Sequence, residues 1–201
     1  MKPLTLHQRC NLYNAAYPNL CPLVCSTQAG KPFFFGHWFV GGGNISSFYG
    51  SYQIEYLERI NVLFPDCKEK KETVHLFSGS IPLSPDYTVV GLPDGEYKPE
   101  LTCNAEQLSS FLPFRPSLIL ADPPYEEAAN GEYAICTVNR AKVVYECAQV
   151  LRPGGFLVWM DQALPVFSND LLRWVGNVSY IRSTANRFRV VSFFQRPANI
   201  K

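Results

Sequence analysis

The chain has 201 residues, of which 47% are hydrophobic and 17% charged, and its formal net charge is +1. This length suits one sizeable α/β core and is short for two, and the composition excludes a disordered chain. The near-neutral balance does not point to a polyanionic partner, although locally clustered positive charge could still bind one. Because no apolar run approaches the roughly 20 residues of a membrane-spanning helix, we expect no membrane partner.

The N-terminal residues carry no signal-peptide apolar region, and the seven cysteines are an odd number. Reduced thiols are therefore a simpler explanation of the cysteines than a disulfide framework. We expect a cytoplasmic protein, in a prokaryote or in the host of a virus.

Residues 1–47 form an extension that is rich in cysteine and aromatic residues, with few charges and no clean hydrophobic period. We predict loops and short strands here, packed on the core. Four side chains, in the spacing H-x2-C-x10-C-x3-C, could bind zinc: His7, Cys10, Cys21 and Cys25. Free thiols that pack as small apolar groups are the alternative that we favour, so we expect no metal. His37 and Trp38 are expected on a strand that packs against the sheet, rather than on a lid.

The second predicted domain spans residues 48–201. Its apolar spacing from Tyr52 to Phe64 predicts a helix that Pro65 ends, and a second helix is predicted at about residues 138–151. Six runs predict strands: TVHLF, YTVV, PSLILA, GFLVWM, VSYI and FRVVSFF. Helical connections imply a mostly parallel sheet, whereas the short segment RSTANR makes the last two strands an antiparallel hairpin. The predicted fold class is therefore α/β.

The most specific feature of the sequence is Asp122-Pro123-Pro124-Tyr125, directly after the predicted strand PSLILA. Open α/β sheets place their ligands at the carboxyl ends of strands, so this position suits a site. The two prolines fix a rigid turn and remove two backbone donors. Asp122 and the Pro123 carbonyl can accept the N–H groups of an amine and orient its lone pair, while Tyr125 stacks on a flat substrate.

ADPPY resembles motif IV of the S-adenosylmethionine-dependent amino-methyltransferases, which methylate N6 of adenine or N4 of cytosine in DNA and have relatives that act on RNA and on protein amides. The resemblance implies a Rossmann-like class I methyltransferase domain over residues 48–201, with S-adenosyl-L-methionine as cofactor. It also implies direct transfer of the methyl group to the amine of a base extruded from its duplex. In this reading the catalytic residues are Asp122, Pro123, Pro124 and Tyr125.

Three further segments resemble the cofactor-binding motifs of this family. VHLFSGS resembles motif I, which implies cofactor contacts from Phe77, Ser78, Gly79 and Ser80, with His75 where the family usually carries an acid. FYGS, before the first predicted helix, resembles motif X and implies contacts from Tyr49 and Gly50 to the methionine end of the cofactor. The acid expected after the second strand is replaced by Gly91, with Asp94 as the nearest substitute, and Asn104 stands at the motif III position.

Three functions remain open on the sequence. The first is methylation of adenine N6 in DNA; the second keeps the methyl chemistry but has RNA, a protein amide or a small molecule as acceptor. The third is a non-catalytic, methyltransferase-like binding subunit. Too few residues separate motif I from DPPY for an inserted recognition domain, so DNA reading would need residues 1–47, a partner chain, a homodimer or a basic hairpin surface. Five arginines form either that surface or an ordinary solvated face: Arg173, Arg182, Arg187, Arg189 and Arg196.

Overall fold

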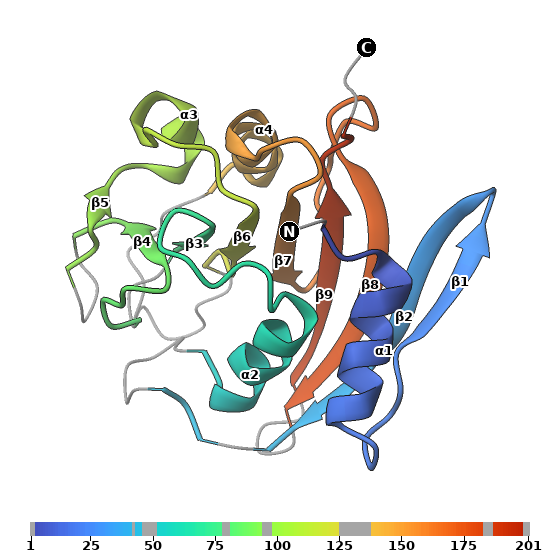
Figure 1. Ribbon diagram of the computed structural model, residues 1–201. Helices are drawn as coiled ribbons and strands as arrows, with labels where there is room; N and C mark the ends of the chain where they lie inside the picture. Colours follow the sequence, from blue (N-terminus) through green and yellow to red (C-terminus); the bar gives the residue numbers. More distant parts are fainter. Residues whose placement is uncertain are drawn as a thin grey trace.

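The computed structural model describes residues 3–41, 43–45, 52–77, 81–93, 98–124, 138–182 and 187–198 (Figure 1). Its strands form one mixed sheet in the order β1-β2-β8-β9-β7-β6-β3-β4-β5. The strand bounds are β1 (Val24–Gln28), β2 (Lys31–Val40), β3 (Thr73–Leu76), β4 (Thr88–Gly91), β5 (Leu101–Thr102), β6 (Leu118–Ala121), β7 (Phe156–Asp161), β8 (Arg173–Arg182) and β9 (Arg187–Gln195). The helices are α1 (Leu6–Ala16), α2 (Ile54–Leu63), the 3-10 turn η1 (Ala105–Gln107), α3 (Leu108–Phe111) and α4 (Arg140–Val150).

Strand direction divides the sheet into a parallel part and an antiparallel hairpin. Strands β5, β4, β3, β6 and β7 are parallel neighbours, whereas β9 runs antiparallel to both β7 and β8. This strand order is the Rossmann-like arrangement of class I methyltransferases, so the predicted fold class is confirmed. All six strands predicted from apolar runs are present.

The parallel strands are buried on both faces, as their continuous apolar runs require. Every residue of β3, β6 and β7 is buried. One face packs against α1 and α2, in a core that includes Tyr13, Ile60 and Phe193. The other face packs against α3 and α4, in a core that includes Leu108, Val144 and Trp159.

The expectation of loops and short strands at the N-terminus is wrong for residues 6–16, which form α1. Thr5 and Gln8 form a capping box that begins this helix, with the Gln8 amide donating to Thr5 Oγ1 at 3.3 Å. The buried positions of α1 are spaced as in an amphipathic helix, but one of them is Arg9. Because this charged residue occupies a buried position, the hydrophobic period of α1 is not evident from the sequence.

The N-terminal hairpin of β1 and β2 belongs to the same sheet as the rest of the chain. Residues 34–40 of β2 pair parallel with residues 176–182 of β8. Gly176 makes room for the Phe34 ring, which would lie 2.4 Å from a Cβ at this position. Trp38 is fully buried, as expected for a strand packed on the core, whereas His37 lies on the opposite, exposed face of β2.

No helix within the described ranges is long and apolar enough to span a bilayer.

Candidate active site

The order in which successive parallel strands are added to the sheet reverses between β3 and β6. From β3 the sheet grows through β4 to β5 on one side, and through β6 to β7 on the other. Open α/β sheets bind ligands in the crevice at such a switch point, outside the carboxyl ends of the strands. Leu76 and Ala121 are paired in register, so Phe77 and Asp122 leave the sheet side by side. The structure therefore brings the start of the motif I segment and the start of DPPY to one edge.

The chain leaves β3 through an unusual backbone conformation. Phe77 has a φ of +63°, in the left-handed region that non-glycine residues seldom adopt. This conformation costs roughly 1–2 kcal/mol and is found where a tight functional turn requires it. The next residues of the segment, Ser78 to Ser80, lie outside the described residues.

Asp122 lies on the α2 face of the sheet and forms an ion pair with Arg189 of β9. The distance between Arg189 Nη1 and Asp122 Oδ2 is 3.5 Å, and the Asp122 side chain is only 10% exposed. Tyr180 of β8 lies directly across from Arg189 and donates its hydroxyl to Gln53 Oε1. The oxygens of a carboxylate have several lone pairs, so one that pairs with a guanidinium can also accept a hydrogen bond from a further donor.

A buried tyrosine hydroxyl, that of Tyr56, lies within electrostatic range of this carboxylate. Burial raises the pKa of Tyr56 well above its usual value, and the charges of Asp122 and Tyr180 raise it further, against the opposing effect of Arg189. The Tyr56 hydroxyl is buried and has no hydrogen-bond partner within the part of the chain that the structure describes. The Tyr56 hydroxyl is thus a neutral donor that feels the charge of Asp122 without bonding to it.

The corner after Asp122 is held by a second network, on the α4 face. Arg140, the first residue of α4, donates Nη2 to the Pro124 carbonyl at 3.1 Å and Nε to Asp161 Oδ2 at 2.7 Å. Asp161 ends β7, is 3% exposed, and also accepts the Trp159 indole N–H at 3.3 Å. Arg140 thus ties the turn after β6 to the end of the neighbouring strand.

Sequence reasoning missed Arg140, Asp161 and Tyr56. Asp161 could have been found by the rule that selected Asp122, because it also follows an apolar run that forms a parallel strand. The roles of Arg140 and Tyr56 depend on contacts between distant segments, which no local pattern in the sequence indicates. Tyr125 lies outside the described residues, so its predicted stacking role stays a prediction.

The predicted cofactor residues are placed unevenly. His75 is buried within β3, with its ring 4.5 Å from that of Tyr87 and 6.1 Å from that of Tyr52. Burial lowers the pKa of His75 to about 3, so the imidazole is neutral. Asn104 is at the expected edge, after β5, where its Oδ1 accepts the Glu106 amide at 2.9 Å and caps η1. Four predicted residues or segments lie outside the described ranges: Tyr49, Gly50, Ser78–Ser80 and Asp94.

The four zinc candidates do not form a site within the described residues. Cys10 is buried on α1 and hydrogen-bonded to Cys25, and burial raises the pKa of the Cys10 thiol to about 12. Cys21 and His7 are both exposed. No group of three or more histidine, cysteine or acidic side chains in the described ranges could hold a metal ion. Cys10 packs as a protonated, apolar thiol.

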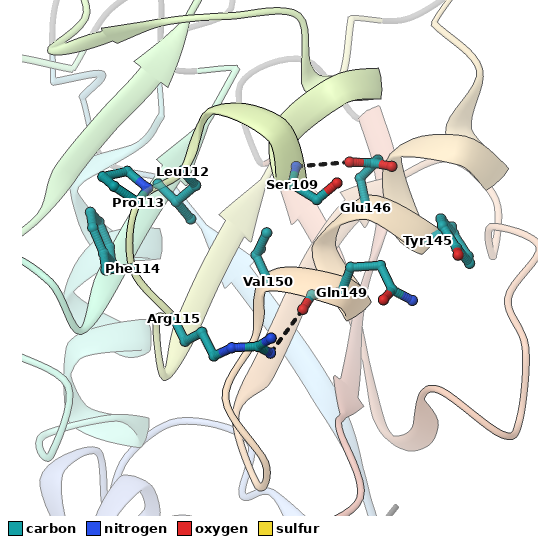
Figure 2. A pocket seen from close by; sticks show the side chains of 9 residues that line it. All are labelled: Ser109, Leu112, Pro113, Phe114, Arg115, Tyr145, Glu146, Gln149 and Val150. Atoms are coloured by element: carbon teal, nitrogen blue, oxygen red, sulfur yellow. Dashed lines mark hydrogen bonds between the residues drawn. The ribbon is translucent and has the colours of Figure 1, made fainter.

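A cavity of about 570 Å³ lies between α3 and α4, away from the strand ends (Figure 2). Glu146 accepts the Ser109 amide at 2.8 Å, and Arg115 donates to the Gln149 carbonyl at 3.1 Å. The first contact joins α3 to α4, and the second joins the segment after α3 to α4. None of the residues predicted for the active site lines this cavity.

Among the arginines near the C-terminus whose side chains the structure describes, three make contacts within the molecule. Arg189 pairs with Asp122, and Arg182 donates to Asn44 Oδ1 at 3.2 Å. Arg196 donates to the Gln149 and Leu151 carbonyls at the end of α4. These three side chains have structural partners, and only Arg173 is described as exposed.

No protein-family model and no curated protein sequence matches this chain. Among solved structures, it is similar to TrmN from Thermus thermophilus (TM-score 0.48, 17% identity over 71% of this chain and 47% of TrmN). It is also similar to the N-methyltransferase NodS from Bradyrhizobium japonicum WM9 (TM-score 0.43, 13% identity, 72% and 98% covered). A third is the T. thermophilus 16S rRNA N2 G1207 methyltransferase RsmC, in complex with AdoMet and guanosine (TM-score 0.37, 17% identity, 90% and 51% covered). The chain spans about half the length of TrmN, and these likenesses assign no role to any residue.

Proposed function

We propose that this chain transfers the methyl group of S-adenosylmethionine to an exocyclic amino nitrogen, with N6 of adenine in DNA as the acceptor. One observation carries the proposal: Asp122 and the following proline carbonyls lie at the switch point of the sheet, beside the turn after β3. A carboxylate and a rigid carbonyl are what an amine needs to hold its N–H groups while its lone pair attacks. The ADPPY sequence supports the same chemistry.

Within this proposal, the two acceptors of the target amine are the Asp122 carboxylate, which pairs with Arg189, and a proline carbonyl near the turn that Arg140 holds. Asp122 accepts one N–H of the target amine through its carboxylate oxygens. Arg140 occupies the Pro124 carbonyl, and we therefore assign the second N–H to the carbonyl of Pro123. The target base is extruded from its duplex and stacks on Tyr125.

Some of the residues described at the strand ends suit S-adenosylmethionine binding, and one does not. The edge offers the backbone turn at Phe77 and the Asn104 amide, which can contact polar groups of a nucleoside. At the end of β4, Gly91 provides no carboxylate for the ribose hydroxyls. When bound, the cofactor supplies an electrophilic sulfonium methyl group. We expect its affinity to be modest, or to depend on a partner.

The test is methyl transfer from labelled S-adenosylmethionine to duplex DNA, with the product identified by mass spectrometry. We expect N6-methyladenine from the wild-type chain and at least about a 100-fold lower rate from Asp122→Ala, because the amine loses its acceptor. Asp170→Ala is the matched control, because Asp170 is exposed and far along the chain from the proposed site. Circular dichroism and cofactor titration separate lost chemistry from lost folding.

The same assay on RNA, lysate protein and small amines decides the acceptor class. Transfer to one of these and not to DNA would overturn the adenine assignment but keep the methyl chemistry. Full activity of Asp122→Ala would overturn the role given to this residue.

The Asp122–Arg189 ion pair favours one second candidate, a binding subunit without catalysis. In this arrangement the carboxylate already has a cationic partner in the protein, as a purely structural acid does. Isothermal titration with S-adenosylhomocysteine and with DNA tests it. Binding without any transfer to the four acceptor classes would favour this second function.

A further inference from the structure

No helix in the described ranges covers one face of the sheet at β1, β2, β8 and β9. Apart from Phe194, the buried apolar side chains of these strands face α1 and α2, and alternation sends the intervening side chains to the other side. We call this surface the open face; its apolar residues are Val24, Phe35, Phe39, Ile181, Phe188 and Val190. Strand pairing sets them together, since Phe35 is opposite Val24, and Ile181 is opposite both Phe39 and Phe188.

The open face is exposed because no described helix covers it. The cluster beneath α3 and α4 covers this side of β9 at Phe194. Phe167, Leu171 and Leu172 of the β7–β8 connection also pack there, and the open face is the part of these strands beyond it. The connection between β7 and β8, residues 162–172, contains no helix. As a result Phe39 is 58% exposed, Phe188 56% and Phe35 43%. Side chains of this size, gathered on one surface, mark an interaction site rather than ordinary exposure.

The open face also lacks charge. At the outward positions of residues 33–39, 177–181 and 188–190, the side chains are apolar, serine, asparagine or His37. Lys31 also points outward, but it lies at the tip of the β1–β2 hairpin, on the rim of the open face. Nucleic acid and anionic lipid would need cations here, whereas charge depletion at the centre of a patch is typical of protein interfaces. The partner is therefore protein.

The dimensions of the open face reach the lower limit for a dimer interface. Strands β2, β8 and β9, each about 30 Å long, and the five-residue β1, about 17 Å long, lie about 4.8 Å apart and give a footprint of at most about 500 Å² per copy. Two such faces would bury about 1,000 Å², the least that a specific interface is expected to bury. Aligned stacking of two sheets, about 10 Å apart, is a common packing of such faces.

The arrangement of side chains on β2 is compatible with two-fold symmetry. Phe35 and Phe39 lie equally far from His37, and His37 is paired with Ser179 of β8. A two-fold axis through His37 would set Phe35 of one copy against Phe39 of the other, and polar His37 and Ser179 against their own equivalents. A neutral patch of this kind is complementary to itself, which an isologous interface requires.

We propose that the open face is the interface of a homodimer, formed by face-to-face packing of two sheets around His37. The aromatic pair of Phe33 and Trp174, with ring centroids 5.0 Å apart, extends the apolar surface toward its rim. The dimer does not depend on the methyl-transfer chemistry, because the open face carries none of the proposed catalytic residues.

Sedimentation velocity over a concentration series tests the proposal on the full chain. We expect the wild type to sediment as a dimer, and Phe35→Asp and Phe39→Asp to raise the dimer dissociation constant by at least about 30-fold. Leu83→Asp is the matched control, since Leu83 is 58% exposed but lies outside the open face. The substituted positions are already solvent-exposed, so thermal unfolding should show that each variant folds.

A cross-link tests the symmetry separately. His37→Cys places a thiol at the axis, and a short bis-maleimide that spans the roughly 10 Å between packed sheets should then yield a cross-linked dimer well above the background from exposed Cys21. A monomeric wild type at tens of micromolar would overturn the proposal and leave a different protein as the occupant. A dimer that survives both aspartate substitutions would place the interface elsewhere.

Discussion

At the scale of single residues, the proposed site depends on a few side chains that join strand ends. Arg140 contacts the turn after β6 and the end of β7 at the same time. We predict that Arg140→Ala lowers the rate of methyl transfer by about 10- to 100-fold and leaves cofactor affinity nearly unchanged, because a small displacement of the acceptors misaligns the attack. Single-turnover kinetics and cofactor titration measure the two effects separately.

Lys142→Ala is the control for this variant, since Lys142 is on the same helix and makes only a 3.8 Å ion pair with Glu106. Partial recovery in Arg140→Lys would agree with a positioning role through charge. A matching loss of cofactor binding in Arg140→Ala would mean that the residue supports the fold instead.

The lowered pKa of buried His75 leads us to predict that the free energy of unfolding depends on pH. Burial lowers its pKa to about 3 in the folded chain, whereas an unfolded histidine has a pKa of about 6.5. Since the unfolded state binds the proton more readily, stability is fully present above pH 6.5 and is lost as the pH falls toward 3. Between pH 7 and pH 5 the loss from His75 is about 2 kcal/mol.

Urea unfolding of wild type and His75→Phe at these two pH values measures this contribution. We expect the wild type to lose more free energy of unfolding than the variant by that amount. Equal losses in the two proteins would show that His75 does not titrate in this way.

At the scale of elements, α1 is joined to the segment after α2 by an ion pair between buried Arg9 and partly buried Asp66. Arg9 is 3% exposed, and donates to both carboxylate oxygens of Asp66 at 2.7 and 2.8 Å. Burial would raise the pKa of Asp66, but the hydrogen bonds and charge of Arg9 lower it below its usual value. Arg9 also lies over the rings of Phe64 and Phe156.

We predict that Asp66→Ala destabilises the chain by about 3–5 kcal/mol, because a buried guanidinium is left without its counter-charge. Chemical denaturation at pH 7 measures the change, with Asp86→Ala as control for an acid on the surface. In the wild type this contribution is present above the usual aspartate pKa and is lost as the pH falls through the lowered one. A cost below 1 kcal/mol would place the pair among weak surface bridges.

The elements that the sequence predicted correctly are those whose signal is local. β6 and all of β7 but its last residue are continuous apolar runs, β3 is a buried strand that includes Thr73 and His75, and α4 is a periodic helix followed by Pro153-Gly154. The missed elements have weak or disguised signals: α1 carries Arg9 in its buried stripe, and β5 has only two residues. Asp122 could be selected as a site residue because it follows an apolar strand. Its partner Arg189 could not, since their contact joins strands that β7 separates.

At the scale of the whole molecule, β9 is the last strand in the sequence, yet it lies in the interior of the sheet between β7 and β8. During synthesis the aromatic hairpin of β1 and β2 emerges early, and must remain without its neighbour until β8 has been made some 140 residues later. Pairing between strands so far apart in sequence slows folding, and the intermediates expose hydrophobic surface that can aggregate or bind chaperones. The sheet is therefore completed late, when the hairpin of β8 and β9 inserts between β2 and β7 and joins the N-terminal hairpin to the parallel strands.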